Sequence, residues 1–187
     1  MDSPGLKILL TASECTPYAK TGGLADVVAG LAKSLRALGH DARVVIPLYA
    51  SIDRLRFNIS FQQTSCVHMG NGEESWIGIY HAMLHEDVPI YFVEHNRFFG
   101  RPGIYNDPAG DYGDNAFRFA LLSKASMQIC KDLNFIPDVI HVHDWPTALV
   151  SAYLKTWDRI LSPLSTTASV LTIHNIGYAG VYHASVL

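Results

Sequence analysis

The sequence has little cysteine and little charge. Its three cysteines, Cys15, Cys66 and Cys130, lie far apart and include no C-x-x-C pair, a pattern that suits a reducing cytosol better than a disulfide framework. Charged residues make up 17% of the 187 residues, and the net charge is −3. Without an excess of positive charge there is no electrostatic reason to expect nucleic acid or an anionic membrane as a partner. Any phosphate must therefore be bound by a local arrangement of residues.

Targeting and membrane signals are also missing. Residues 1–5 are polar and lack the basic start and apolar stretch of a signal peptide. No apolar run approaches the length that a membrane-spanning helix needs. We therefore expect a cytoplasmic protein that associates with neither a membrane nor nucleic acid.

About half of the sequence is apolar, and its first part alternates strand and helix patterns. Residues 6–12 form a short apolar run typical of a strand buried on both faces, and residues 13–23 form a loop that ends in two glycines. Apolar residues then recur at helical spacing over residues 24–38, and residues 43–48 predict a second buried strand. This order is a βαβ unit with parallel strands.

The middle of the chain favours β structure. Residues 55–94 carry three β-favouring runs, with a strong turn signal at residues 69–72, and predict a small antiparallel meander inserted in or packed beside the parallel sheet. The last run, residues 89–94, is alternatively another core strand. Residues 95–111 form a loop too long for a simple connector, and such loops are usually functional or disordered.

Regular α/β order returns in the last third. The pattern predicts a helix over residues 112–133, a strand at 139–143, a helix from Pro146 to about Trp157 and a strand at 169–174. The whole chain therefore predicts a Rossmann-like parallel sheet with helices on both faces and a small antiparallel β insertion. Because no closing helix follows the last strand, we expect residues 1–187 to be one domain that is incomplete at its C-terminus.

Polar residues follow three of the predicted strands, at the sheet edge where ligands of parallel sheets bind. In the first loop, Lys20 and two glycines precede a helix N-terminus, an arrangement that favours an anion such as a phosphate. The alternative is a flexible glycine turn with a solvated lysine. The spacing matches neither G-x-G-x-x-G nor the Walker pattern, which argues against a Rossmann dehydrogenase or a P-loop NTPase.

The other two clusters contain histidine. His141 and His143 face the same side of their strand and, with Asp144, raise the hypothesis of a metal-dependent hydrolase. Alternatively, His141 is a hydrogen-bonded core histidine, only His143 and Asp144 reach the cleft, and Asp144 is a helix cap. His174 is either a site residue or a strand-end histidine, and Trp145 is more typical of packing than of a sugar platform.

Together these segments resemble bacterial glycogen synthases and plant starch synthases. The resemblance covers the chain from Lys7 to its end. It is carried by residues 13–14 (SE), 20–28 (KTGGLADVV), 101–105 (RPGIY), 114–119 (DNAFRF), 141–145 (HVHDW) and 174–178 (HNIGY). Pro146 and Ala179 depart from residues that are frequent in the family and affect the acceptor side.

The resemblance implies the N-terminal, glucan-side half of a GT-B fold, with the C-terminal nucleotide-binding domain absent from this chain. It implies retaining transfer of glucose from ADP-glucose, or less often UDP-glucose, to the non-reducing end of an α-1,4-glucan, with no metal and no other cofactor. We expect the chain alone to fold but not to transfer glucose. A non-catalytic carbohydrate- or nucleotide-binding domain is the remaining alternative.

The resemblance also assigns roles to single residues. Lys20 corresponds to a lysine that meets the donor's diphosphate, and the glycines beside it allow close backbone approach. Asp144 corresponds to an acidic residue near the transferred sugar, and His174 to a histidine that contacts the glucosyl unit. The implied catalytic residues are thus His174 and Asp144, and the implied substrate-binding residues are Lys20, Gly22, Gly23, Asp26, Glu14, Trp145 and Asn175.

Overall fold

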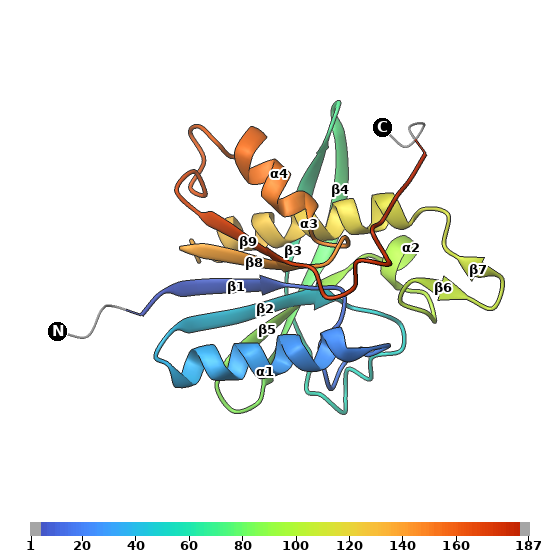
Figure 1. Cartoon of the computed structure of the whole chain (residues 1–187), viewed down its shortest axis with the longest axis horizontal. Coiled ribbons are helices and arrows are strands. Elements are labelled where there is room, and N and C mark those ends of the chain that lie inside the picture. Colours follow the sequence, from blue (N-terminus) through green and yellow to red (C-terminus); the bar gives the residue numbers. More distant parts are fainter. Residues whose placement is uncertain (1–4, 184–187) are drawn as a thin grey trace.

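A computed structural model of the chain describes residues 5–183, so the predictions about residues 1–4 and 184–187 lie outside the described part. Its main feature is a seven-stranded sheet with helices on both faces (Figure 1). The elements in chain order are β1 (Lys7–Thr11), α1 (Gly23–Ala37), β2 (Asp41–Pro47), β3 (Ser60–Gly70), β4 (Glu73–Leu84), β5 (Val88–Glu94), α2 (Asn96–Phe99), β6 (Asn106–Asp107), β7 (Gly110–Asp111), α3 (Asn115–Asp132), β8 (Val139–His143), α4 (Leu149–Thr156) and β9 (Ala168–Thr172). Across residues 5–183, no helix combines the length and the apolar composition that crossing a bilayer requires.

The strand order in the sheet is β3-β4-β5-β2-β1-β8-β9. Strands β5, β2, β1, β8 and β9 are parallel, as predicted. Helix α1 covers one face, whereas α3 and α4 cover the other (Figure 1). Strand β1 lies between β2, which follows it in the chain, and β8, which comes much later. The chain therefore reverses its direction of travel across the sheet beside β1, and such a switch point is where doubly wound sheets bind ligands.

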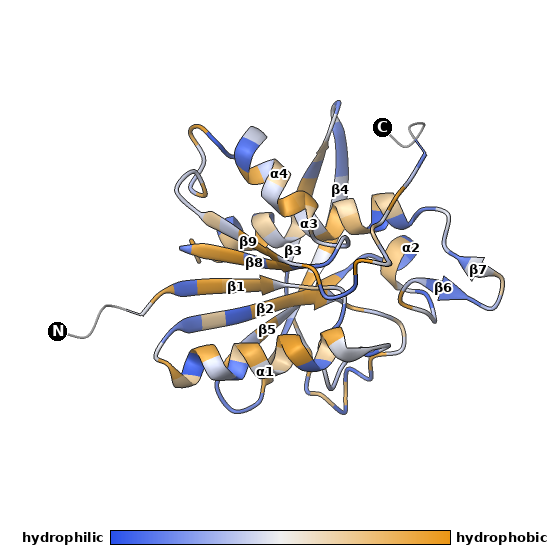
Figure 2. Cartoon of the chain, in the orientation of Figure 1, coloured by the Kyte–Doolittle hydropathy of each residue, from blue (hydrophilic) through white to orange (hydrophobic). Residues whose placement is uncertain are grey.

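The apolar side chains of the central strands are buried, and so is one face of the helix that follows β1. All of β1 after Lys7 is buried, and Figure 2 shows β1, β8 and β9 mainly in the hydrophobic colour. In α1, Leu24, Val28 and Ala32 are buried at helical spacing, and Val27 is exposed on the other side. This pattern confirms the helix predicted over residues 24–38, which covers the sheet with a single apolar stripe.

The antiparallel meander is part of the main sheet. Strand β4 pairs antiparallel with both β3 and β5, while the other edge of β5 pairs parallel with β2. The two interpretations of residues 89–94 are therefore both right, because β5 is the last strand of the meander and also a core strand. The turn between β3 and β4 is confirmed: Gly70, Asn71 and Gly72 have φ values of 110°, 51° and 79°, which glycine and asparagine adopt most readily.

The long segment between β5 and α3 is ordered, and two arginines hold it in place. It contains α2 and the small β6–β7 hairpin, which lie beyond the carboxyl ends of the central strands (Figure 1). Arg101 forms a bidentate ion pair with Asp114, with N···O distances of 2.7 and 2.5 Å. The fully buried Arg118 donates to the carbonyl oxygens of Phe98 and Ile104, at 2.6 and 2.9 Å. The alternative of disorder is wrong because these contacts fix both ends of the segment.

Two boundaries near the end of the chain differ from the prediction. Helix α4 begins at Leu149, three residues after Pro146, because the chain first makes turns after Asp144 adopts a left-handed φ of 56°. Strand β9 ends at Thr172, so His174 lies in the bend that follows. Strand β9 is also the edge of the sheet, and its Val170 and Leu171 are 46% and 44% exposed.

Arg118 makes a testable contribution to this fold. We expect Arg118→Leu to lower the free energy of unfolding by about 2–4 kcal/mol, because it leaves the buried carbonyls of Phe98 and Ile104 and the Asn115 Oδ1 without their donor. Urea denaturation measures the change, and Arg97→Ala, an exposed change in the same segment, is the control. Equal stability of the two variants would contradict this role.

Candidate active site

The predicted site residues gather at the carboxyl edge of the parallel strands. The glycine loop follows β1, Asp144 follows β8 and His174 follows β9, and these three strands are neighbours in the sheet. Figure 1 shows the start of α1, the segment containing β6 and β7, and the chain after β9 on this same side of the molecule. Strands β1 and β8 flank the switch point, so the loops meet where a doubly wound sheet binds its ligand.

Glu14 organises the glycine loop from inside the protein. Its carboxylate is buried and accepts hydrogen bonds from the backbone N–H and the hydroxyl of Thr21, the latter at 2.7 Å, and from the N–H of Gly22 at 3.3 Å. The Tyr105 hydroxyl donates to the same carboxylate at 2.6 Å. Burial is the main cause that raises the pKa of Tyr105, which keeps this donor protonated. Glu14 thus holds the loop against the segment that contains β6 and β7.

Lys20 and Asp26 form an ion pair at the surface beside the start of α1. Lys20 Nζ lies 2.7 Å from Asp26 Oδ2, and the Thr16 hydroxyl donates to Asp26 Oδ1 at 2.8 Å. The hydrogen bond from Lys20, followed by that from Thr16, lowers the pKa of Asp26. Both charged side chains are 52% exposed, and an exposed pair of this kind is weak enough to exchange partners. Lys20 is therefore available to a stronger anionic partner such as a phosphate.

The two glycines of the loop have no packing reason to be glycine. A Cβ added at Gly22 or Gly23 would meet no atom of the described residues within 4 Å. Gly22 has a φ of −149°, which is extended backbone and is open to other residues. Gly22 is also the N-cap of α1, and it supplies no side-chain cap to the first turn of the helix. The open space and the helix start together leave room for an anion to approach the backbone.

Asp144 links the chain after β9 to the end of β8. Its Oδ1 accepts hydrogen bonds from the backbone N–H of His174 at 2.6 Å and of Asn175 at 3.4 Å. Its own N–H donates to the Thr172 carbonyl at 2.9 Å. The interpretation of Asp144 as a helix cap is wrong, because α4 begins at Leu149 and the carboxylate is used by the neighbouring segment. Asp144 therefore fixes the backbone position of His174.

Three histidine rings stack at this edge. The ring centroids of His141 and His143 are 4.3 Å apart, those of His143 and His174 are 5.3 Å apart, and the rings are nearly parallel. His143 Nδ1 lies 3.0 Å from His174 Nε2, and His141 Nε2 lies 2.7 Å from the Thr172 hydroxyl. His143 is the fully buried ring, while His141 is partly exposed, so the alternative in which His141 is the core histidine is wrong. His143 is the more buried ring because it contacts both other histidines, a packing detail that strand alternation does not contain.

The central histidine is neutral. Burial, and then the charges of His141 and His174, lower the pKa of His143 from 6.5 to about 3. Within the described residues, the Nε2 of His143 is buried without a hydrogen-bond partner. We assign the proton of His143 to Nδ1, because an unpaired buried N–H costs more than an unpaired lone pair. His143 then donates to Nε2 of His174 and orients that exposed ring.

These contacts do not assemble the metal site of the hydrolase hypothesis. Nδ1 of His143 faces His174, and the Asp144 carboxylate faces backbone N–H groups. In the described part of the chain, one group of three residues has ligand atoms close enough to share a cation. It consists of Cys66, His68 and Glu74 and includes none of these residues. The geometry therefore gives the hydrolase interpretation no support.

Trp145 and Asn175 shape the surroundings. Trp145 packs edge-on against Phe119, with ring centroids 5.0 Å apart, and contacts Tyr182 at 5.7 Å. Asn175 accepts a hydrogen bond from the N–H of Gly177 at 3.0 Å. Trp145 is thus mainly a packing residue that supports the chain after β9. Sequence reasoning missed Tyr105 as a part of the site, although it ends the R-P-G-I-Y segment that was singled out.

The buried state of His143 predicts a pH dependence of stability. In the unfolded chain the imidazole takes up a proton near pH 6.5, whereas the folded protein resists protonation until about pH 3. Stability contributed by neutral His143 is therefore present above pH 6.5 and is lost as the pH falls through this window, by at most about 1.4 kcal/mol per pH unit.

Urea unfolding between neutral pH and pH 4 measures this effect. We expect His143→Asn to reduce the slope of stability against pH relative to the unchanged protein. His85→Asn is the matched control, because His85 is exposed and its φ of 55° suits asparagine. Parallel curves for the His143 variant and the unchanged protein would show that His143 does not carry the effect.

Comparisons with known proteins agree over nearly the whole chain. Residues 7–187 match the family described as starch synthase catalytic domain. Glycogen synthase 1 of Geobacter sulfurreducens is 44% identical, and glycogen synthase of Treponema denticola is 42% identical; each alignment covers 95% of this chain and 36% of the relative. The catalytic domain of starch synthase IV from Arabidopsis thaliana, solved with ADP and acarbose, superimposes with a TM-score of 0.82 and 28% identity, over 95% of this chain and 38% of that one. The chain spans little more than a third of the length of these relatives, and it belongs to the starch synthase catalytic domain family.

Proposed function

We propose that this chain is the glucan-side half of the active site of a glycogen or starch synthase. In this proposal the complete enzyme transfers glucose from ADP-glucose, with retention, to the non-reducing end of an α-1,4-glucan. Residues 1–187 form the N-terminal domain of a GT-B fold, and a second domain, outside this chain, supplies most contacts to the nucleotide. The observation that carries the proposal is the meeting of an open glycine loop with Lys20, Asp144 and His174 at one sheet edge, in a chain of this family.

The glycine loop is suited to the diphosphate of the donor. The departing nucleoside diphosphate is an anion, and the amide groups of Thr21 and Gly22 already bind the carboxylate of Glu14. The anion is therefore expected at the uncapped start of α1, beside Gly23 and the exposed ammonium group of Lys20. When Lys20 moves from Asp26 to the diphosphate, it stabilises the leaving group.

Asp144 and His174, which are joined by a hydrogen bond, are suited to bind the transferred sugar. Transfer of a glucosyl group passes through a transition state with positive charge near the anomeric carbon, so the reacting groups must be held in place and water excluded. Asp144 fixes the backbone of His174, and His143 fixes its ring. We assign to His174 the contact with the glucosyl unit and to Asp144 the position near sugar and acceptor. Of the other residues that we assign to substrate binding, Asp26 and Asn175 are exposed at the site, whereas Glu14 and Trp145 act by supporting the segments that form it.

We place the enzyme in the cytoplasm and assign no cofactor to the reaction. Its partners are ADP-glucose and an α-1,4-glucan. The starch synthase IV structure supports this choice because that protein was solved with ADP and acarbose. A single domain supplies one wall of the cleft, so this chain by itself is expected to fold without transferring glucose.

Lys20 gives the first test of the donor assignment. In an enzyme of full length that contains this segment, we expect Lys20→Ala to reduce the rate at limiting ADP-glucose by about tenfold or more, because a charge-assisted contact contributes about 1.5–3 kcal/mol. Lys33→Ala, a change of an exposed lysine on the helix that follows the loop, is the matched control. An unchanged rate in the Lys20 variant, with its fold intact, would remove Lys20 from the donor site.

His174 tests the catalytic assignment. In the enzyme of full length, His174→Ala should reduce turnover by about a hundredfold. The urea midpoint should fall only slightly, because His174 is exposed and water replaces it as the acceptor for the His143 Nδ1–H. The measurement compares kcat at saturating donor with the free energy of unfolding for the same protein. A loss of stability that accounts for the lost activity would mean that His174 has a structural role instead.

A further inference from the structure

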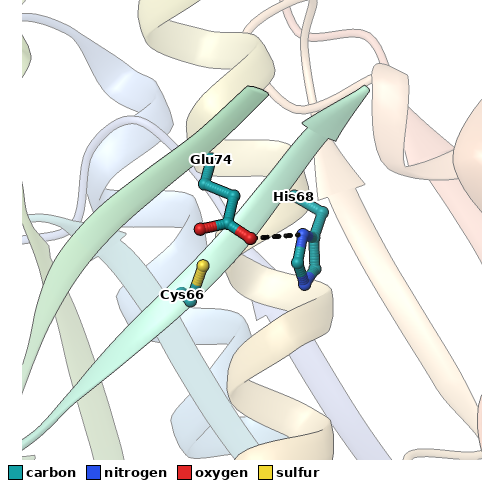
Figure 3. A group of neighbouring side chains, drawn as sticks. All are labelled: Cys66, His68 and Glu74. Atoms are coloured by element: carbon teal, nitrogen blue, oxygen red, sulfur yellow. Dashed lines mark ion pairs between the residues drawn. The ribbon is translucent and has the colours of Figure 1, made fainter. Parts of the chain in front are cut away.

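The β3–β4 hairpin carries a second cluster of polar side chains, outside the proposed active site. Cys66 and His68 lie two residues apart on β3 and point to the same face, because side chains alternate along a strand. His68 is paired across the ladder with Glu74 of β4, and Cys66 is paired with Trp76. Val67, between the two ligands, is buried on the opposite face. Figure 3 shows the three side chains converging from the two strands.

The distances fit a shared cation. The thiol, imidazole and carboxylate ligand atoms of the three residues all lie within 4.8 Å of one another, and His68 Nδ1 is 3.5 Å from Glu74 Oε1. Bonds to zinc of about 2.0–2.3 Å place tetrahedral ligand atoms about 3.3–3.6 Å apart. Since His68 and Glu74 are exposed, small side-chain rotations close the difference without moving the backbone.

We propose that Cys66, His68 and Glu74 bind one zinc-type divalent cation, with a water molecule in the fourth position. Thiolate, imidazole and carboxylate are ligands that Zn²⁺ accepts together, whereas Mg²⁺ and Ca²⁺ select oxygen ligands only. The charges also match, because a thiolate and a carboxylate together neutralise a divalent ion. The proposed site lies outside the site that we assign to glucosyl transfer.

The neighbouring turn and edge give the cation a role. The site links β3 to β4 directly before the turn at Gly70–Gly72, and β3 is the edge strand of the sheet. The ladder between the two strands shifts register between His68 and Gly70, and a bulge weakens pairing at that point. A cation held by both strands fixes the register at the end of the hairpin.

The thiol makes the binding detectable and pH-dependent. The cation binds the thiolate, so it must displace the proton of the Cys66 thiol, and binding strengthens as the pH rises. The other thiols do not compete, because Cys15 and Cys130 are fully buried and burial raises the pKa of each to about 12. A thiolate–metal signal from this protein therefore reports on Cys66.

Cobalt(II) titration of the reduced, metal-free 187-residue chain tests the proposal. We expect one equivalent of Co²⁺ to produce a thiolate-to-metal charge-transfer band and tetrahedral ligand-field bands, and Zn²⁺ to remove both. Cys66→Ser should abolish the charge-transfer band, and His68→Ala and Glu74→Gln should each weaken binding by about tenfold or more. Glu73→Gln, an exposed change on the adjacent residue, is the matched control and should bind like the unchanged protein.

Two readouts separate the possible results. Circular dichroism and the urea midpoint verify that each variant is folded, which is expected because the three ligands belong to an outward face of the hairpin. Zinc should also slow alkylation of Cys66 by iodoacetamide, and this protection should disappear in His68→Ala. The proposal is overturned if no thiolate band forms, if the band persists in Cys66→Ser, or if the His68 and Glu74 variants bind as tightly as the Glu73 control.

Discussion

The buried carboxylate of Glu14 is the contact on which the candidate site depends. Four donor groups converge on it, from the backbone and hydroxyl of Thr21, from Gly22 and from Tyr105. A buried negative charge is tolerated only where hydrogen bonds replace its water, so these groups hold one another in place. The loop after β1, the start of α1 and the segment before α3 therefore form a single unit. An anionic ligand therefore binds beside a loop whose shape is set by the Glu14 carboxylate.

Some segments that identify the family hold the fold together more than they approach a ligand. Arg101 and Asp114 belong to two different segments of the resemblance, and they pair with each other across the β6–β7 region. Arg118 ties the same region to α3 through backbone carbonyls. Similarity in these segments indicates a shared scaffold, whereas Lys20 and His174 have side chains that are exposed at the site.

The order of strands and helices could be predicted from the sequence because each buried strand and each amphipathic helix has its own hydrophobic period. The shared edge of Asp144 and His174 followed from parallel pairing alone. The order of burial of His141 and His143 could not be predicted, because both face the same side and the difference depends on what covers them. The late start of α4 could not be predicted from the sequence either, because it results from the left-handed backbone at Asp144. The assigned roles of the site residues stay predictions.

The edge position of β9 has a consequence for handling the protein. Adjacent residues of a strand point to opposite faces, and both Val170 and Leu171 are partly open to water, as is Ile173 beyond the strand end. One side of β9 pairs with β8, and no strand of the described residues pairs with its other side. An apolar strand with an unpaired edge is a template on which a second chain can add a strand. Association between copies at this edge is therefore expected to increase with concentration, and a charged substitution at Val170 is the direct way to oppose it.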